Sequence, residues 1–198
     1  MTKKTAPKRL IVGISGSSGV IYGIRLLELL RKIQGVESHL IVSNSAKLNI
    51  QLETDWSLKD VEALADQVYD FKNIAANISS GSFKTIGMVI APCSIKTLSG
   101  IANCYTDNLL TRAADVILKE RRKLILMVRE SPLHSGHCKL LYEASLLGAI
   151  LAPPTPAFYN HPSNLDDIIN HSVGRVLDLF DIDAGVVKRW GGPSKSYY

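Results

Sequence analysis

The sequence has few of the residues that build metal centres and disulfide networks. Its 198 residues include only three cysteines, Cys93, Cys104 and Cys138, with no Cys-x-x-Cys pair, and its five histidines lack HExxH or comparable spacing. We therefore expect neither a metal site nor a disulfide framework, and the sparse, odd set of thiols favours the cytoplasm. No apolar run approaches the roughly 18 residues that span a bilayer, and no signal-peptide pattern follows the basic N-terminus. We expect no association with a membrane.

Acidic residues are outnumbered only because of the two ends of the chain. The 23 Lys and Arg residues exceed the 18 Asp and Glu residues, which gives a net charge of +5. Four of the basic residues lie in residues 1–9 and three in residues 188–198, and neither segment contains an acid. The other 16 basic residues face all 18 acidic ones, so the body of the chain has a charge of −2. This distribution argues against a nucleic-acid-binding face.

Apolar, β-branched runs alternate with longer segments of helical periodicity, and no linker or repeat divides them. This alternation predicts an α/β fold, a Rossmann-like or flavodoxin-like three-layer sandwich with a mostly parallel sheet. We assign residues 9–190 to one domain, with a flexible basic N-terminal tail (1–8) and a C-terminal tail (191–198). The expected strands are Arg9–Ser15, Ser38–Ser43, Gln67–Phe71, Thr85–Ala91, Lys123–Val128 and Ala149–Ala152. The expected helices are Val20–Ile33, Asn44–Glu53, Ser57–Ala65, Asp107–Arg121, Cys138–Leu147 and a helix that begins at Ser163 and ends near Phe180.

Ligands of such sheets bind outside the carboxyl ends of the strands, so the loops after the strands are the candidate site. The first loop, Gly13 to Gly19, is rich in glycine and serine and precedes a helix, as an anion-binding loop requires. It matches neither GxGxxG nor GxxxxGK[ST], which argues against a dinucleotide site and a P-loop. A tight turn needed only for packing is the alternative interpretation of this loop.

Two further strand-end segments carry polar chemistry. Ser94-Ile95-Lys96-Thr97 offers two hydroxyls and an ammonium, which suit a phosphate or sugar hydroxyls, although Ser94 could simply cap a helix. Arg129 and Glu130 directly follow an apolar strand, which is costly unless they face a polar cleft or form a structural ion pair. An arginine there can bind phosphate, and a glutamate can act as a general base.

These loops resemble those of the UbiX-like flavin prenyltransferases, formerly described as aromatic or phenylacrylic acid decarboxylases. The resemblance extends from about Arg9 to Trp190 and depends on six segments in a fixed order. They are Gly13-Ile-Ser-Gly-Ser-Ser-Gly-Val-Ile-Tyr-Gly23, Ala91-Pro-Cys-Ser-Ile-Lys-Thr-Leu98, Asn108-Leu-Leu-Thr-Arg-Ala-Ala-Asp115, Leu118-Lys-Glu-Arg-Arg122, Arg129-Glu-Ser-Pro132 and Pro156-Ala-Phe-Tyr159.

The resemblance implies a metal-independent prenyltransferase that joins the dimethylallyl group of dimethylallyl phosphate to N5 and C6 of reduced FMN. The prenylated FMN would serve a partner decarboxylase of the UbiD type. The resemblance also implies a homo-oligomer, a dodecamer with active sites at subunit contacts. Residues 9–190 would then form a single flavoprotein domain.

The same resemblance assigns roles to individual residues. On the flavin side it implies Gly16, Ser17, Ser18, Ser43, Ser94, Ile95, Lys96, Thr97 and Arg129, with the Ser18 hydroxyl near N5. On the side of the allylic substrate it implies Arg112, Lys119, Arg129, Tyr159, Arg175 and Trp190. Ser18, Glu53, Lys119 and Glu130 are the implied catalytic residues, with Glu130 in proton handling.

Two alternatives remain open at this point. The first is an FMN-dependent decarboxylase that acts directly on an aromatic or other carboxylic acid, as do the cysteine decarboxylases of this fold. Those relatives carry a Pro-x-Met-Asn-x-x-Met-Trp segment and a catalytic cysteine in a late loop, whereas here Cys138 falls in an expected helix. The second is a non-catalytic flavin carrier, which would not need Lys119, Tyr159 and Arg175.

Overall fold

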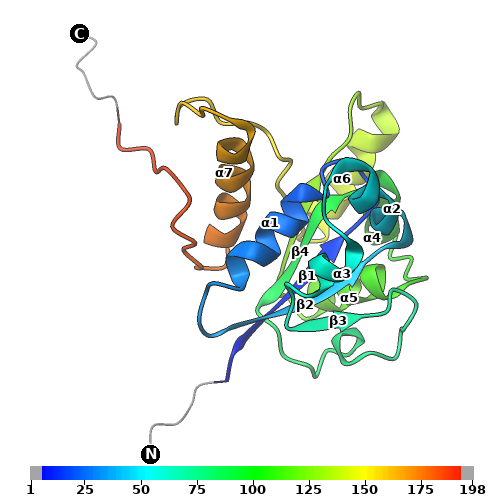
Figure 1. Cartoon of the computed structure of the whole chain (residues 1–198). Helices are drawn as coiled ribbons and strands as arrows, with labels where there is room; N and C mark the ends of the chain where they lie inside the picture. The colour runs from blue at the N-terminus through cyan, green and yellow to red at the C-terminus, as the bar shows by residue number, and fades with distance from the viewer. Residues whose placement is uncertain (1–5, 193–198) are drawn as a thin grey trace, which may run out of the picture.

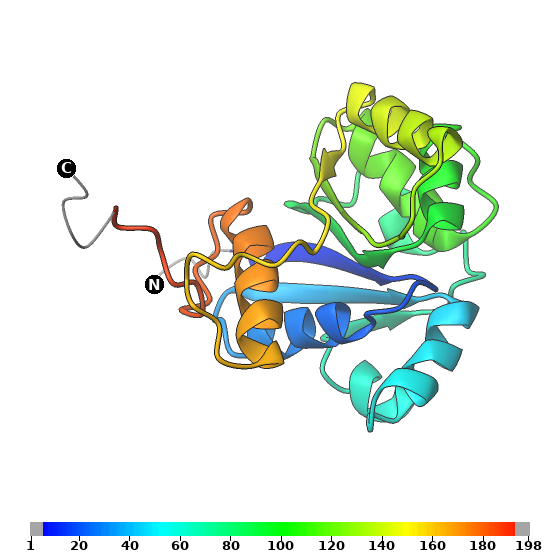
Figure 2. The ribbon, with the colours of Figure 1, turned by 90° about the horizontal axis from the view of Figure 1, so that it is seen from above.

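The structure, a computed structural model, describes residues 6–192, which form a parallel sheet between two layers of helices (Figures 1 and 2). The strands are β1 (Lys8–Ile14), β2 (Val36–Val42), β3 (Gln67–Tyr69), β4 (Gly87–Cys93), β5 (Lys123–Val128) and β6 (Ile150–Leu151). The helices are α1 (Ile21–Leu30), α2 (Asn44–Glu53), α3 (Leu58–Glu62), α4 (Ile95–Ala102), α5 (Leu109–Lys119), α6 (Ser135–Leu146) and α7 (Leu165–Asp178), with a 3-10 turn η1 (Asn77–Ser79).

The sheet has the order β3-β2-β1-β4-β5-β6, and every neighbouring pair is parallel. This confirms the predicted α/β sandwich. Without the three-residue edge strand β3, the order of the remaining strands is that of flavodoxin-like folds. The order reverses between β1 and β4, so the crevice in which such folds bind ligands lies outside the carboxyl ends of these two strands.

Both faces of the sheet are apolar because helices cover both (Figure 1). Leu10, Val12 and Ile14 of β1 pack toward α1 and α7, and Ile11 packs toward α4 and α5. Gly13 lies where β1 meets α5, and a Cβ atom there would stand 2.4 Å from Leu110 Cδ1. The absence of a side chain at this position therefore lets α5 pack closely on the sheet.

Only α2 and β5 have the predicted bounds, and the other predicted elements begin or end up to three residues away from them. Three differences concern the tails and the helix caps. Strand β1 begins at Lys8, inside the expected tail 1–8, because the Lys8 N–H bonds to the Gly35 carbonyl next to β2. Helix α4 is absent from the expected helices except as the one that Ser94 could cap, and it forms over eight residues with Ser94 as its cap. Helix α7 is capped by Asn164 instead of Ser163, since Asn164 Oδ1 accepts from the Asp167 N–H at 2.9 Å.

Residues 1–5 and 193–198 of the two expected tails lie outside the described residues. None of the helices in residues 6–192 has the length and apolar content needed to cross a bilayer.

Candidate active site

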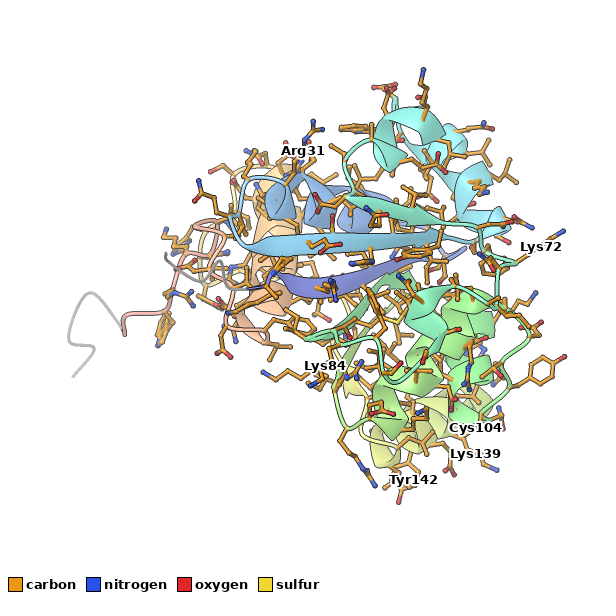
Figure 3. The ribbon with its side chains drawn as sticks, turned by 90° about the horizontal axis from the view of Figure 1, so that it is seen from below. Arg31, Lys72, Lys84, Cys104, Lys139 and Tyr142 are labelled. Carbon is orange, nitrogen blue, oxygen red and sulfur yellow. The ribbon has the colours of Figure 1, made fainter. Side chains whose placement is uncertain are left out.

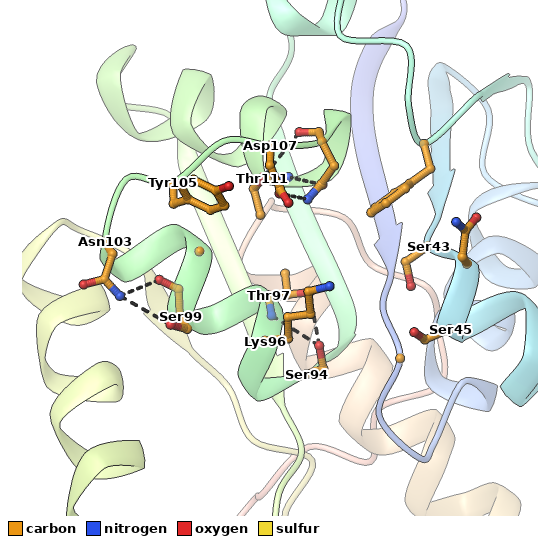
Figure 4. A pocket seen from close by; sticks show the side chains of 15 residues that line it. Ser43, Ser45, Ser94, Lys96, Thr97, Ser99, Asn103, Tyr105, Asp107 and Thr111 are labelled. Carbon is orange, nitrogen blue, oxygen red and sulfur yellow. Dashed lines mark hydrogen bonds between the residues drawn. The ribbon is translucent and has the colours of Figure 1, made fainter.

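Three helices begin at the rim of one cavity beside the carboxyl ends of β1, β2 and β4 (Figure 4). Their N-caps are Ser43 for α2, Ser94 for α4 and Asn108 for α5, and each side chain accepts a hydrogen bond from its own helix's first turn. The cavity has a volume of about 720 Å³ and also includes Lys96 and Thr97 in its wall. Helix N-termini present free N–H groups and a partial positive charge, so this cavity is suited to a phosphate.

The first loop is held against α2 by a very close contact. A Cβ atom on Gly16 would lie 2.3 Å from Ser45 Cβ, so only glycine fits here. Behind the loop, Ser15 Oγ donates to the Pro92 carbonyl and accepts from the Ser94 N–H at 2.8 Å, which joins β1 to the start of α4. The glycine is thus required by a close approach, and the loop also forms one wall of the cavity.

The remaining residues of the first loop leave polar groups available. Ser17 Oγ is buried and has no hydrogen-bond partner in the described part of the chain. Ser18 is exposed, and the next residue, Gly19, donates its N–H to Glu53 Oε2 at 2.8 Å. An unpaired buried hydroxyl in a ligand-binding loop fits a polar group of a bound flavin.

Arg129 and Glu130 stand at the same edge of the sheet, after β5. Both side chains are exposed, and neither forms an ion pair within residues 6–192. The Arg129 N–H bonds to the Cys93 carbonyl, which fixes the backbone next to β4. Burial raises the pKa of Tyr22 on α1, and the charge of Arg129 partly opposes that rise. Within the described residues, Arg129 and Glu130 therefore do not form the structural ion pair that was considered, and Glu130 Oε1 accepts only from the neighbouring Ser131 N–H, at 3.0 Å.

A second group of predicted residues surrounds a cavity of about 250 Å³ that lies between α7 and the C-terminal segment. Tyr159, Arg175 and Trp190 line it together with Arg189, which the sequence-based set did not include. The Tyr159 and Trp190 rings meet edge to face at 5.6 Å between their centroids. An aromatic wall with two guanidinium groups suits a small anion that carries an apolar tail.

Asp178 holds both arginines of this second cavity. Its carboxylate accepts from Arg175 at 2.7 Å and from both terminal nitrogens of Arg189, at 2.9 and 3.0 Å. The bonds from Arg189 are the main cause that lowers the pKa of Asp178 below its ordinary value. Asp183 Oδ1 also lies 3.7 Å from Arg189, so two carboxylates face the two guanidinium groups beside the cavity.

The two cavities lie at opposite edges of the sheet. The end of α7 reaches the amino edge, because Lys123 at the start of β5 donates to the Leu179 carbonyl and Phe180 packs against Gly87 at the start of β4. Figure 2 shows α7 beside the start of β1 and α2 at the far end of the sheet. A single chain therefore does not bring Tyr159, Arg175 and Trp190 to the first cavity.

The other two predicted cations, Arg112 and Lys119, lie toward opposite ends of α5. Arg112 lies one turn from the first cavity, half-exposed, and pairs with Asp115 at 2.9 Å. Lys119 is the last residue of α5, at the amino edge, where it bonds to Glu120 at 2.5 Å. Lys119 is thus also outside the first cavity of its own chain.

Several residues of the first cavity were missed in the sequence. Phe71 follows the edge strand β3, so the rule that ligands bind at strand ends could have found it. Asn108 precedes an apolar helical pattern, which is a recognisable cap signal. The cavity residues outside the predicted set are Asn44, Ser45, Phe71, Ser99, Gly100, Asn103, Tyr105, Asp107, Asn108 and Thr111.

The three cysteines have different environments. Cys93 is buried in β4, and burial raises the pKa of its thiol far above the ordinary value, as expected for a small apolar core residue. Cys104 and Cys138 are exposed, Cys104 at the surface that Figure 3 shows and Cys138 within α6, as predicted. Among residues 6–192, no three His, Cys, Asp or Glu side chains are grouped so as to hold a metal ion.

The fold and the first cavity define an α/β protein with a phosphate-suited site at the carboxyl edge of its sheet, and a family model described as Flavoprotein matches residues 1–154. The flavin prenyltransferase UbiX of Escherichia coli K12 is 60% identical over 187 residues, which cover 93% of this chain and 99% of that protein. The chain belongs to the UbiX-like flavin prenyltransferases, and the family confirms the prediction of a prenyl-transferring flavoenzyme.

Two solved structures have the same fold over nearly the whole chain. AnUbiX (PadA1), in complex with FMN and dimethylallyl pyrophosphate, superposes with a TM-score of 0.93 at 45% identity, covering 95% of this chain and 100% of that one. A dodecameric FMN-dependent UbiX-like decarboxylase from Escherichia coli O157:H7 has a TM-score of 0.91 at 50% identity, covering 93% and 100%. A decarboxylase that acts directly on a carboxylic acid and a non-catalytic flavin carrier both lose support, because the 60% identical relative is named a flavin prenyltransferase, although the dodecameric structure is named a decarboxylase.

Proposed function

We propose that the first cavity binds the phosphate and ribityl chain of FMN. The main support is that three capped helix N-termini converge on this cavity and that Lys96 lies in the cavity wall (Figure 4). These N–H groups neutralise a phosphate without a metal ion. The flavin ring would then lie along Gly16, Ser17 and Ser18.

We further propose that Tyr159, Arg175 and Lys119 hold the phosphate of the allylic donor, with Trp190 against its dimethylallyl group. In the reaction the C–O bond of the donor would break, its electron pair would leave with the phosphate, and the first allyl carbon would bond to N5, which loses its proton. Protonation of the remaining C=C bond would then let the tertiary carbon bond to C6, which loses its own proton. Cations at the phosphate stabilise the charge that develops on the leaving group. Glu130, exposed beside Arg129, would take part in the removal of a proton that the flavin loses.

The separation of the two cavities supports an oligomeric enzyme. Since Arg175 and Lys119 lie outside the first cavity of their own chain, we propose that neighbouring subunits supply them to it. The dodecameric relative supports an assembly of this kind, and a dodecamer is the proposed form. Arg112, near the rim of the first cavity, would lie close to this contact.

The experiment that tests this function is anaerobic incubation with reduced FMN and dimethylallyl phosphate, followed by mass spectrometry of the flavin. We expect a flavin that is heavier by one C5H8 unit, formed as phosphate is released. A parallel reaction with dimethylallyl diphosphate decides which donor is used. Recovery of only unmodified FMN with both donors, while a known family member is active, would refute the proposal.

The consumer of the product is proposed to be a decarboxylase of the UbiD type in the cytoplasm. The support is chemical, because a modified flavin is useful only to an enzyme that binds it. Adding the reaction mixture to such an apo-decarboxylase should restore its activity, and a mixture without the donor should not.

A further inference from the structure

A buried histidine lies directly behind Tyr159. His171 Nε2 and the Tyr159 hydroxyl oxygen are 3.2 Å apart, and the two rings meet edge to face at 5.7 Å. His171 is only 6% exposed, on the inner side of α7. Trp190 also packs edge to face on the Tyr159 ring. The Tyr159 ring therefore has two aromatic neighbours, and His171 is the one that also forms a hydrogen bond with its hydroxyl.

The surroundings of His171 indicate which nitrogen carries the proton. Nδ1 is buried and has no hydrogen-bond partner in the described residues. A buried N–H without an acceptor is rarer and costlier than a buried lone pair, so the tautomer with hydrogen on Nε2 fits the site. Burial is the main cause that lowers the pKa of His171, and the nearby Arg175 charge lowers it further, while Asp178 opposes this, so the ring is neutral near pH 7.

We propose that His171 is a positioning residue for the allylic substrate, because its Nε2–H donates to the Tyr159 oxygen and leaves the Tyr159 O–H free to donate to the donor phosphate. This rests on the proposed function, in which Tyr159 and Arg175 bind that phosphate. Without His171 the hydroxyl would be free to rotate, and the phosphate would lose a prealigned donor. The role acts on binding of the donor and not on the flavin.

The test compares His171→Phe, which removes the hydrogen bond at similar size, with His171→Gln, whose amide can still donate. We expect His171→Phe to raise KM for dimethylallyl phosphate about fivefold, the effect of one hydrogen bond, and to leave KM for reduced FMN unchanged. His171→Gln should stay within about twofold of the parent. Ser172→Ala is the matched control, since it removes a hydrogen bond to the Ile168 carbonyl on the same helix without touching Tyr159.

A second measurement separates positioning from simple loss of structure. In a Tyr159→Phe background, His171→Phe should have no further effect on KM for the donor, because the hydroxyl that it aligns is gone. Three results would overturn this inference alone. KM could rise equally for both substrates, or the two substitutions could have additive effects in the double variant. KM for the donor could also stay unchanged in His171→Phe while Tyr159→Phe and Arg175→Ala each raise it. If Tyr159→Phe and Arg175→Ala also leave KM unchanged, the proposed donor site fails together with it.

Discussion

Glu53 at the end of α2 accepts a hydrogen bond from the backbone N–H of Gly19, 34 residues away in the sequence, at 2.8 Å. The bond ties the last turn of one helix to the loop that precedes α1, so the shape of the flavin loop depends on a carboxylate outside it. We predict that Glu53→Ala weakens FMN binding about fivefold, as expected for one lost hydrogen bond. Glu53→Gln, which keeps an acceptor, should bind FMN like the parent. Fluorescence titration with FMN measures both, and equal losses in the two variants would contradict the anchoring role.

Gly16 is the second point at which α2 shapes the flavin loop. Gly16→Ala would place a methyl group 2.3 Å from Ser45 Cβ, so we expect a loss of about 1–3 kcal/mol in the free energy of unfolding and weaker FMN binding. Removing the opposing Cβ atom should relieve the clash. The double variant Gly16→Ala, Ser45→Gly is therefore expected to recover FMN binding, which urea denaturation and titration together would show. If Ser45→Gly does not restore FMN binding and stability, the loss caused by Gly16→Ala does not come from this contact.

The helix caps at the cavity should affect binding beyond their effect on stability. Ser94→Ala removes the cap of α4 and should cost about 1 kcal/mol in the free energy of unfolding. It should also raise the Kd for FMN about fivefold, because the hydroxyl and the aligned N–H groups face the cavity. Ser57→Ala removes an equivalent cap from α3, outside the cavity wall, and is the matched control. It should show the same loss of stability with an unchanged Kd.

Asp178 links the stability of the C-terminal segment to pH. Its pKa is lowered in the folded protein, so its contribution to stability is complete above the ordinary aspartate pKa of about 4 and disappears as pH falls through the folded value. The free energy of unfolding of the parent should therefore exceed that of Asp178→Asn by a constant amount at neutral pH and by less at acidic pH. Urea denaturation at a series of pH values measures the difference. A difference that grows as pH falls would contradict the assignment.

The same substitution should also affect the donor site. Because Asp178 holds Arg175 and Arg189 in place, Asp178→Asn should raise KM for dimethylallyl phosphate about fivefold, the effect of one lost hydrogen bond. KM for reduced FMN should remain unchanged, since the flavin cavity shares no residue with this one. Steady-state kinetics with each substrate varied in turn would show the split.

The sequence predicted one half of the site for a physical reason and the other half only by resemblance. Ser43, Ser94 and Arg129 each follow a strand, and because parallel strands end at the same edge, these residues must gather there. Lys119 and Arg175 lie in the last turns of helices that return to the amino edge, so no rule for a single chain could unite them with the flavin. Local ambiguity explains the shifted start of α7, since adjacent residues, Ser163 and Asn164, can both cap a helix.

A site made from two subunits predicts complementation between inactive variants. Ser94→Asp keeps a good helix cap but places a carboxylate at the proposed site of the flavin phosphate, and Arg175→Ala removes a cation from the proposed donor cavity. Assayed with dimethylallyl phosphate far below the raised KM of Arg175→Ala, each variant alone should have almost no activity. In oligomers assembled from equal amounts of both, random mixing leaves about one quarter of the sites with both halves intact, and activity should recover to that level. The control is a mixture of Ser94→Asp and Lys96→Glu, because both changes damage the flavin half of the site. The activity of this mixture should recover only if Ser94 and Lys96 act from different subunits. A mixture of Ser94→Asp and Arg175→Ala that stays inactive in confirmed mixed oligomers would mean that each chain forms its complete site alone.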